Sequence, residues 1–358
     1  MENNNSKEEI NTNNKKNNNT EEKIRFFLEK WTKLVDPKIK EILSLSVSKR
    51  MQKLINYQVA MGGKRFRPAL TIASCLVCNG KIEDALYPAA GLEILHNYTL
   101  IYDDIIDNSE LRRGKPTVWF NFGKSIAQCI GMDYGASIFQ AANRSKNSFV
   151  ISEIFSKTIK NVVEGEILDI LFEQSKREDE KYIMKNRYKN ITEDDYLKMV
   201  SKKTSSLICA CCEVGALVAE ARESEIKALK NYGFNLGAAF QIKDDILDIF
   251  GEEKDFGKKI GKDIEERKLG NVVIFHALKE FSSKEKEEFL KILRKDKIES
   301  QDIKKAVNLI KKTKAQERSF SFGEKYIERA KESLKKLPKN KWNEFLSEIA
   351  DFVIKRKK

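Results

Sequence analysis

The sequence predicts an all-α fold, a single large helical bundle, and three observations support this prediction. Only 5 of the 358 residues are proline, and none of them lies between residues 117 and 337. Because proline interrupts helix interiors and punctuates loops, this long proline-free stretch favours long helices. The 17 glycines are few for a β-rich chain with many tight turns. Apolar residues also recur at three- and four-residue spacing, as in Ile24, Phe27, Leu28, Trp31 and Leu34.

The expected elements follow this spacing along the chain. Residues 1–20 are rich in asparagine and lysine and almost without apolar side chains, so we expect a disordered tail there. Residues 21–358 are expected to form one domain, because no internal boundary and no regular repeat divides them. After a first helical stretch from Glu21, the expected helices cover residues 39–60, 66–79, 83–107, 117–144, 147–176, 193–221, 223–250 and 266–281, and shorter amphipathic segments follow.

The net charge of +13 is concentrated near the C-terminus. Residues 279–358 contain 24 Lys plus Arg and 14 Asp plus Glu, interleaved at helical spacing. Such a pattern is typical of a solvated helix face. Nucleic-acid-binding modules combine clustered basic residues with aromatics or glycines, and this region has no such cluster, so we expect no nucleic-acid partner. A weak surface association with anionic lipid stays open.

The six cysteines indicate a reducing compartment rather than a disulfide framework. Cys75 and Cys78 form a C-x-x-C, which can be redox-active or half of a zinc site. Their neighbours are apolar with helical period, and no second C-x-x-C or paired histidine follows, so buried free thiols are favoured. No signal peptide and no apolar stretch of membrane-spanning length is evident. We therefore expect a cytoplasmic protein without a transmembrane segment.

Two acidic clusters lie within apolar helices and share one spacing. Asp103, Asp104 and Asp107 spell D-D-x-x-D, and Asp244, Asp245 and Asp248 repeat it. Residues four apart share a helix face, so their ionised carboxylates repel each other. Partial burial beside Ile and Leu makes this repulsion costly unless a cation compensates it. Two acidic solvent faces are the simpler alternative, but two matched copies in apolar helices favour magnesium, which prefers hard oxygen ligands and often bridges to phosphate.

Two short cationic segments complement these clusters. Gly62–Pro68 contains three cations on a turn that enters a helix, and its glycines let the backbone approach an anion. Leu111–Lys115 adds three more cations just after the first acidic helix. Arginine binds phosphate oxygens through two parallel hydrogen bonds, which lysine cannot do. Ordinary helix-end cations would explain one segment, whereas the combination with the acidic clusters indicates a diphosphate-binding site.

In these motifs the sequence resembles the trans-isoprenyl diphosphate synthases, which form the polyprenyl synthetase family. Gly62–Pro68 matches G-G-K-R-x-R-P, Asp103–Pro116 matches the first aspartate-rich motif with L-R-R-G-x-P, and Phe240–Asp248 matches F-Q-x-x-D-D-x-x-D. Lys203-Thr204 matches a further family segment, and the resemblance covers about residues 25–350. It implies an isoprenoid-synthase bundle around a deep central cavity, a homodimer, and head-to-tail condensation of allylic diphosphates with isopentenyl diphosphate.

The resemblance also implies roles for individual residues. Up to three magnesium ions would lie on the allylic diphosphate, held by Asp103, Asp107 and Asp244 with support from Asp104 and Asp248. The same diphosphate would be bound by Arg112, Lys203, Thr204, Gln241 and Lys258, and Lys203, Thr204 and Gln241 are the catalytic candidates. Isopentenyl diphosphate would be bound by Lys64, Arg67, His96 and Arg113. Magnesium and these cations would stabilise the negative charge that develops on the departing diphosphate. The allylic carbocation would then alkylate isopentenyl diphosphate, and a proton would pass to the released diphosphate.

Product length depends on the residues just before the first acidic cluster. Tyr98 lies five residues before Asp103, about 7.5 Å deeper along the helix, where it is either the floor of the product cavity or an ordinary core tyrosine. A bulky residue followed by a small one, Tyr98 then Thr99, resembles archaeal-type geranylgeranyl diphosphate synthases. We therefore expect geranylgeranyl diphosphate as the product, with farnesyl diphosphate as the alternative.

The sequence departs from the family pattern at two informative places. The common G-K-x-T-L-P is replaced by residues 267–271, which leaves the role of Lys268 open, and the usual Gly-Gln reads Gly165-Glu166 with Asp169 retained. Three rival functions are weaker. A class I terpene cyclase would lack Gly62–Pro68, a non-catalytic partner subunit would lose aspartates, and a basic nucleic-acid or membrane-surface protein would not need six clustered aspartates.

Overall fold

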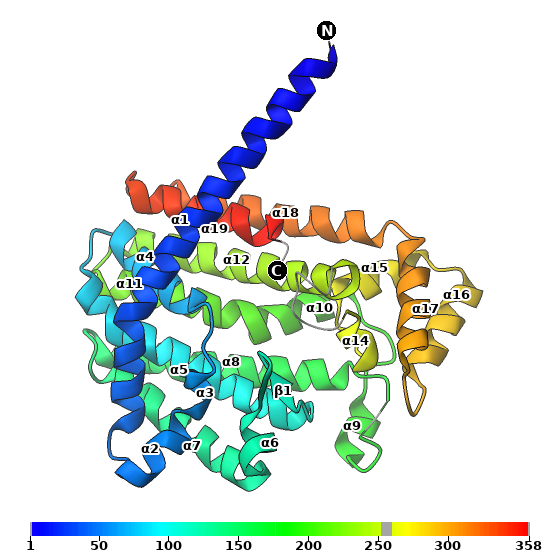
Figure 1. Cartoon of the computed structure of the whole chain (residues 1–358), viewed down its shortest axis with the longest axis horizontal. Helices are drawn as coiled ribbons and strands as arrows, with labels where there is room; N and C mark the ends of the chain where they lie inside the picture. Colours follow the sequence, from blue (N-terminus) through cyan, green and yellow to red (C-terminus); the bar gives the residue numbers. More distant parts are fainter. Residues whose placement is uncertain (1, 176, 252–259, 357–358) are drawn as a thin grey trace.

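The structure of the chain, a computed structural model, describes residues 20–175, 177–251 and 260–356. It is a stack of helices in which α5 (Ile82–Ile106), α8 (Ser148–Leu171), α12 (Glu223–Phe250) and α18 (Ala315–Leu334) run across the molecule (Figure 1). The all-α prediction is confirmed, because the strands of the described residues are limited to one two-stranded hairpin. The predicted tail, residues 1–20, lies outside the described residues except for Thr20.

Two expected helices are divided in the structure. The segment 39–60 breaks after α1 (Glu2–Ser44), because Ser46 has a left-handed backbone with φ of 59°. It continues as α2 (Lys49–Ile55) and α3 (Tyr57–Ala60). The segment 117–144 breaks at Gly123 into α6 (Val118–Phe122) and α7 (Lys124–Ala142). Conversely, α1 and α5 pass through Pro37 and Pro88, so proline does not end these two helices.

The expected helix 193–221 contains a π-helical turn. Thr192 caps α10 (Glu193–Val200) by accepting a hydrogen bond from the Asp195 amide at 3.1 Å. The π-helix η1 (Ser201–Ser205) follows and leads directly into α11 (Ser206–Val218). A π-turn changes the direction of side chains within a helix and is frequent at functional sites. It contains Lys203 and Thr204.

A β-hairpin follows the first acidic cluster and was not expected from the sequence. Strands β1 (Leu111–Arg112) and β2 (Lys115–Pro116) pair antiparallel. The turn residues Arg113 and Gly114 both have positive φ, 54° and 72°, as a two-residue hairpin turn requires. The hairpin turns Arg112 back toward the helix that precedes it.

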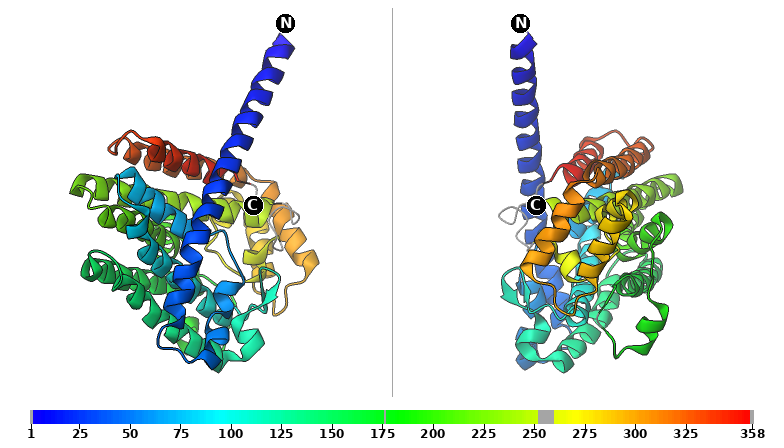
Figure 2. Two further views of the ribbon diagram at one scale, coloured as in Figure 1. Left: turned by 60° about the vertical axis from the view of Figure 1, so that its left-hand side comes forward. Right: turned by 90° about the vertical axis from the view of Figure 1, so that its right-hand side faces the viewer.

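The remaining helices complete the layers around α12. Figure 2 shows α16 and α17 packed together at one end of the molecule. Asn271 caps α15 by accepting hydrogen bonds from the amides of Val273 at 2.9 Å and Ile274 at 3.3 Å. The other bounds are α4 (Phe66–Val77), α9 (Lys181–Asn186), α14 (Lys262–Glu265), α15 (Val272–Glu280), α16 (Ser283–Leu293), α17 (Ser300–Lys311) and α19 (Lys341–Lys355).

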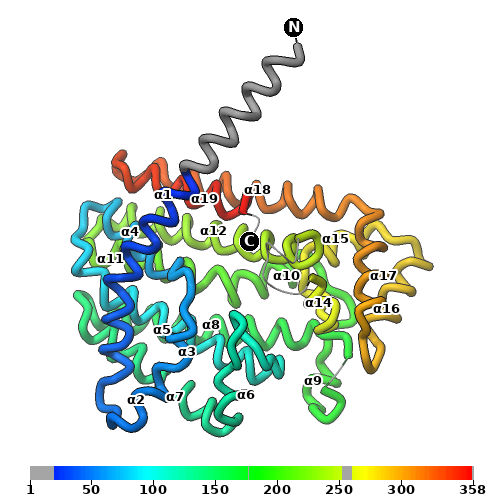
Figure 3. The backbone as a smooth tube through the Cα atoms, viewed as in Figure 1, coloured from blue at the N-terminus to red at the C-terminus, as the bar shows by residue number. Residues whose placement is uncertain are grey.

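Aromatic packing joins the two ends of the described chain. Trp31 of α1 is fully buried, and its ring lies 5.6 Å from the rings of both Trp342 and Phe345 of α19. The tube in Figure 3 shows α1 and α19 close together. Aromatic pairs at this spacing stabilise the packing of the helices that carry them. The C-terminal helix is thereby held near α4 and α12, so that its last residues reach the acidic end of α12.

Two findings concern the expected compartment. All six cysteines are free thiols, and Cys75, Cys211 and Cys212 are buried. Within the described residues, no helix combines the length and apolar character needed to cross a membrane.

Candidate active site

The two acidic clusters end two long helices and border one cavity. The first cluster lies at the C-terminal end of α5, and the second lies at the C-terminal end of α12. A cavity of about 180 Å³ is bordered by Asp107 from the first and by Asp244 and Asp248 from the second. Lys203 borders the same cavity. The fold therefore brings both clusters and a lysine of the π-turn together.

The first cluster contains one paired aspartate and two that are not neutralised. Arg112 binds Asp104 through two groups, with Nε 2.9 Å from Oδ2 and Nη2 2.8 Å from Oδ1. Burial, reinforced by the nearby Glu166 carboxylate, raises the pKa of Asp103 to about 8. Burial also raises the pKa of Asp107. Asp103 and Asp107 thus lie in an environment that disfavours their negative charge.

The three aspartates of the second cluster have different surroundings. Asp244 forms an ion pair with Arg356, whose Nη2 lies 2.6 Å from Oδ1. Asp245 is buried and accepts hydrogen bonds from the Tyr196 hydroxyl at 2.8 Å and the Val272 amide at 2.9 Å. It therefore holds α10 and the start of α15 against α12.

Asp248 accepts hydrogen bonds from two backbone amides of α14. The Lys262 amide donates to Oδ1 at 3.0 Å, and the Asp263 amide donates to Oδ2 at 3.2 Å. Burial and the neighbouring Asp263 carboxylate nevertheless raise the pKa of Asp248 to about 9. Amide donors alone do not compensate a carboxylate that is 7% exposed.

The π-turn lies directly against α8 and α12. A Cβ atom on Gly165 would lie 2.3 Å from the Lys203 nitrogen, so only glycine lets α8 approach η1 this closely. The Lys203 ammonium lies 2.6 Å from both Glu166 and Asp169. On the side facing α12, the Thr204 hydroxyl donates to Gln241 Oε1 at 2.7 Å.

Gln241 connects the π-turn to the second cluster. Its amide nitrogen donates to Asp245 Oδ1 at 2.9 Å, while its carbonyl oxygen accepts from Thr204. This bridge fixes the side-chain amide in one orientation. Thr204, Gln241 and Asp245 therefore form one continuous hydrogen-bonded row along the cavity wall.

Lys268, whose role the sequence left open, lies in the same site. Its ammonium is 3.0 Å from Asp169 and 3.0 Å from Glu266, and the residue is 8% exposed. These carboxylates raise its pKa well above the usual value, against the effect of burial. Lys268 is therefore positively charged, and it borders the cavity.

The cationic turn before α4 is organised by a buried ion pair. Arg65 has a left-handed backbone, with φ of 49°, and its side chain points inward rather than to the cavity. Its Nη1 lies 3.0 Å from Glu93, its Nε lies 2.7 Å from Asp36, and its Nη2 donates to the Val59 carbonyl at 3.1 Å. Arg65 thereby holds the turn against α1 and α5.

The residues expected to bind isopentenyl diphosphate lie on or beside the turn before α4. Arg113 of the hairpin donates to the Gly62 carbonyl oxygen. Arg67 has a buried Nε without a hydrogen-bond partner among the described residues. Burial and the charge of Arg67 lower the pKa of His96 well below its usual value, so this imidazole is neutral. Lys64 is exposed on the same turn. The Glu93 carboxylate acts on both Arg67 and Arg113 and favours their charged forms.

Tyr98 and Thr99 lie deeper along α5. The Tyr98 ring packs edge-on against the Tyr102 ring, with centroids 5.0 Å apart. Tyr98 Cε2 would lie 3.7 Å from a Cβ on Gly135 of α7, an ordinary packing distance. The Thr99 hydroxyl donates to the His96 carbonyl at 2.8 Å. Tyr98 is partly buried and packs between α5 and α7, next to the helix turn that carries the first cluster.

The comparisons with known proteins agree with this geometry. Residues 48–310 match the family model described as polyprenyl synthetase. This chain belongs to the polyprenyl synthetase family. It is 37% identical to the short chain isoprenyl diphosphate synthase of Methanocaldococcus jannaschii, over 76% of this chain and 81% of that protein. It is 36% identical to the geranylgeranyl diphosphate synthase of Saccharolobus solfataricus, over 83% of this chain and 87% of that protein.

A solved structure resembles this polyprenyl synthetase over nearly its whole length. The crystal structure of geranylgeranyl pyrophosphate synthetase from Pyrococcus horikoshii superposes with a TM-score of 0.83 and 33% identity. The match covers 94% of this chain and 99% of that one. The all-α bundle is therefore the fold of this family.

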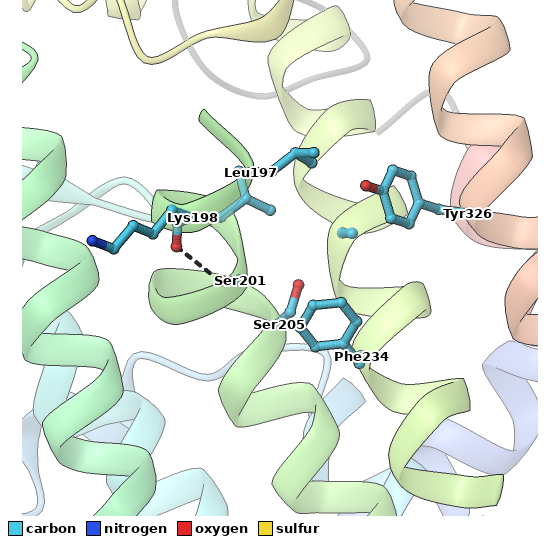
Figure 4. A pocket seen from close by; sticks show the side chains of 8 residues that line it. Leu197, Lys198, Ser201, Ser205, Phe234 and Tyr326 are labelled. Carbon is cyan, nitrogen blue, oxygen red and sulfur yellow. Dashed lines mark hydrogen bonds between the residues drawn. The ribbon is translucent and has the colours of Figure 1, made fainter. Parts of the chain in front are cut away.

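A second cavity of this polyprenyl synthetase lies behind the π-turn. It has a volume of about 270 Å³ and lies between the α10–η1 segment, α12 and α18, where Leu197, Phe234 and Tyr326 border it (Figure 4). The buried Ser205 hydroxyl also borders it, and no described residue hydrogen-bonds to this oxygen. This cavity does not include the acidic clusters.

Four residues of this polyprenyl synthetase site were not assigned roles from the sequence: Arg65, Glu93, Glu166 and Arg356. Their contacts join segments far apart in the chain. Two of them left a signal in the sequence: Arg65 belongs to the motif Gly62–Pro68, and Glu166 departs from the family pattern. Lys258, expected to bind the allylic diphosphate, lies outside the described residues. Within the described residues, no group of three or more His, Cys, Asp or Glu side chains is arranged to hold a metal ion.

Proposed function

We propose that this chain condenses an allylic diphosphate with isopentenyl diphosphate, head to tail and with magnesium, and that its product is geranylgeranyl diphosphate. The observation that carries this proposal is the presence of two different candidate sites for diphosphate groups. Carboxylates and lysines border one cavity, and a turn rich in arginine lies beside it. Its class as a trans-prenyltransferase follows from family membership and from relatives named as geranylgeranyl diphosphate synthases.

The allylic diphosphate is assigned to the cavity between the acidic clusters. Lys203, Gln241 and Lys268 border it, and Thr204 is hydrogen-bonded to Gln241. Arg112, held by Asp104, lies at its hairpin side. Lysine and arginine at these positions stabilise the negative charge that develops on the departing diphosphate. Gln241 and Thr204 keep their mutual orientation through the hydrogen bond between them.

The residues of the acidic clusters fit magnesium. Asp103, Asp107 and Asp248 are partly or fully buried oxygen donors, and burial disfavours the charge of each. A divalent cation removes this penalty, and magnesium is commonly held by few carboxylates together with substrate phosphates. Asp103, Asp107 and Asp244 would hold the ions, with Asp104 and Asp248 in support. Bound magnesium supplies positive charge that stabilises the leaving diphosphate.

Isopentenyl diphosphate is assigned to the arginine-rich turn. Lys64, Arg67, His96 and Arg113 surround this turn, and Arg67 carries an unpaired buried Nε. Because His96 is neutral, it can donate one hydrogen bond to a phosphate oxygen without adding charge. The allylic carbon then forms a bond with the double bond of isopentenyl diphosphate, the bond to the diphosphate breaks, and a proton leaves with the released diphosphate.

The product length is assigned to Tyr98. Its ring packs between α5 and α7, next to the helix turn that carries Asp103, where a growing prenyl tail would meet it. Thr99 is small and turned to its own helix backbone, so it leaves room beside the ring. With Tyr98 as the floor of the product cavity, the proposed product is geranylgeranyl diphosphate. A floor closer to the acidic clusters would give farnesyl diphosphate instead.

The chain is proposed to act as a homodimer in the cytoplasm. Large apolar side chains are exposed along α7 and α8, with Met132 70% exposed and Phe149 78% exposed. Patches of this kind on a folded chain mark association surfaces. A charged substitution, Met132→Glu, is expected to give monomers in sedimentation experiments, and an unchanged mass would refute this surface.

The function is tested by incubation with labelled isopentenyl diphosphate and one allylic primer at a time, with magnesium or with a chelator. We expect labelled geranylgeranyl diphosphate only with magnesium. Labelled farnesyl diphosphate as the end product would correct the assigned length. No elongation with any primer would refute the proposed function.

A further inference from the structure

Six residues form a row of alternating charges, which we call the ion-pair chain, and all of them except Glu166 border the active-site cavity. Its members come from α8, η1, α14 and the segment before α15. Successive nitrogen–oxygen distances are 2.6, 2.6, 3.0, 3.0 and 2.8 Å. In order the members are Glu166, Lys203, Asp169, Lys268, Glu266 and Lys262.

The ion-pair chain is neutral by itself. It contains three carboxylates and three ammonium groups, and each of its inner members contacts two opposite charges. Lys203 and Lys268, which border the cavity, are therefore already compensated without a diphosphate. A diphosphate that binds these lysines must compete with the carboxylates that hold them.

Glu166 forms one end of the ion-pair chain. Its Oε2 is buried and lies 2.6 Å from Lys203 Nζ, in an ion pair whose atoms are not aligned as a hydrogen bond. The hydrogen bond of that ammonium goes to Asp169 Oδ2, also at 2.6 Å. Glu166 also lies near enough to Asp103 to be the main charge that acts against its ionisation. It thus stands between a lysine and a proposed metal ligand.

The position of Glu166 is set by backbone packing. Gly165 lets α8 lie against η1 so closely that a Cβ there would be 2.6 Å from the Lys203 Cα. The next residue therefore faces the π-turn and the end of α5. Glu164, two residues earlier, points to the outside, where it pairs with Lys202 at 2.6 Å and is 50% exposed.

From this arrangement we propose that Glu166 exchanges Lys203 for the magnesium ion at Asp103, and so couples metal binding to diphosphate binding. The inference rests on the proposed function and adds a regulatory step to the same site. Without metal, Glu166 and Asp169 both hold the Lys203 ammonium. With metal, the Glu166 carboxylate would leave Lys203 for the ion, and the Lys203 ammonium would then be able to donate hydrogen bonds to the diphosphate.

Such an exchange makes the two binding events help each other. By thermodynamic linkage, magnesium raises the affinity for diphosphate by the same factor by which diphosphate raises the affinity for magnesium. A neutral glutamine at position 166 would hold Lys203 weakly and would be a poorer metal ligand. Both changes reduce the coupling.

The test measures binding, not turnover. Inorganic diphosphate and Mg²⁺ are titrated separately and together into the full-length protein by calorimetry, with the solution affinity of Mg²⁺ for diphosphate subtracted. For Glu166→Gln we expect diphosphate alone to bind about tenfold more tightly, Mg²⁺ alone to bind more weakly, and the coupling factor to fall about tenfold. Glu164→Gln, which breaks the matched outward pair, should behave like the wild type.

A second variant separates charge from structure. Glu166→Asp keeps the carboxylate and should keep most of the coupling. Coupling unchanged in Glu166→Gln, or lost equally in Glu166→Asp and Glu164→Gln, would overturn the inference and leave the proposed function standing. A wild-type protein that binds no diphosphate even with Mg²⁺ would instead refute the proposed function.

Discussion

Arg356, near the C-terminus, is paired with Asp244 of the second acidic cluster, with Nη2 and Oδ1 2.6 Å apart. The guanidinium also lies 4.0 Å from the centre of the Phe240 ring and donates to the Phe240 carbonyl at 3.1 Å. The ring in turn packs against Phe66 of α4, with centroids 5.6 Å apart. Arg356, at the end of α19, thus contacts Asp244, a proposed metal ligand. Through Phe240 it is also linked to Phe66, the first residue of α4.

Arg356→Gln is expected to strengthen magnesium binding in the absence of substrate. The arginine and the metal compete for Asp244, and a partly exposed ion pair contributes up to about 1 kcal/mol, which corresponds to roughly a fivefold lower dissociation constant. Calorimetric titration with Mg²⁺ measures this. Arg329→Gln is the control, because Arg329 packs on Tyr326 of α18 rather than on an acidic cluster. Weaker Mg²⁺ binding in Arg356→Gln would contradict the competition.

Tyr98→Ala is expected to lengthen the product by at least about one isoprene unit, because it removes the ring between α5 and α7. Chromatography of the dephosphorylated products measures the distribution. Tyr87→Ala is the matched control on the same helix, since the Tyr87 hydroxyl bonds Glu41 at 2.8 Å away from the cavity. The same product profile in Tyr98→Ala and the wild type would exclude Tyr98 as the floor.

Stability of the metal-free protein should fall between pH 7 and 8. The pKa values of Asp103 and Asp248 are raised to about 8 and about 9. The folded state therefore binds more protons than the unfolded state, whose aspartates titrate near 3.9, and the unfolding free energy decreases as pH rises toward the folded pKa. One to two extra protons correspond to about 2 kcal/mol over this pH unit, or about 3 °C in melting temperature for a chain of 358 residues.

Two further measurements test whether the raised aspartate pKa values cause this pH dependence. Asp248→Asn should reduce the slope by about half, because one of the two raised carboxyl groups no longer titrates. Saturating Mg²⁺ should flatten it, because the ion favours the charged carboxylates at every pH. Melting curves at both pH values measure these effects, and an equal slope in Asp248→Asn and the wild type would argue against the raised pKa of Asp248.

Glu93→Gln should destabilise the fold and weaken isopentenyl diphosphate binding together. Glu93 is 2% exposed and pairs with Arg65 at 3.0 Å. Removing one partner of a buried pair costs about 3–5 kcal/mol when the other charge is left alone. Arg65 keeps its second pair with Asp36 at 2.7 Å, so we expect a loss at or below the lower end of this range. Denaturant unfolding measures this loss, and a raised KM for isopentenyl diphosphate would report the displaced turn. Glu287→Gln, in the exposed pair with Lys291, should leave both values unchanged.

Local patterns in the sequence were sufficient for the helices and for the residues of the two acidic clusters. Helical periodicity and the D-D-x-x-D spacing are properties of neighbouring residues, and the backbone of a helix converts them directly into a shared face. The breaks at Ser46 and Gly123, the hairpin after Asn108 and the π-turn were not predicted. They depend on single left-handed residues and on packing, which overrides local preference.

The sequence by itself determined the all-α class, the acidic and cationic motifs, and the family they resemble. Only the tertiary structure decided which charges meet: Arg356 with Asp244, 112 residues away, and Lys203 with Glu166 and Asp169. An ion pair requires two side chains within a few ångströms, and helix packing alone sets that distance for residues far apart in the chain. For this reason Asp244, Asp245 and Asp248 look alike in the sequence, whereas their partners in the fold are an arginine, a tyrosine with an amide, and two backbone amides.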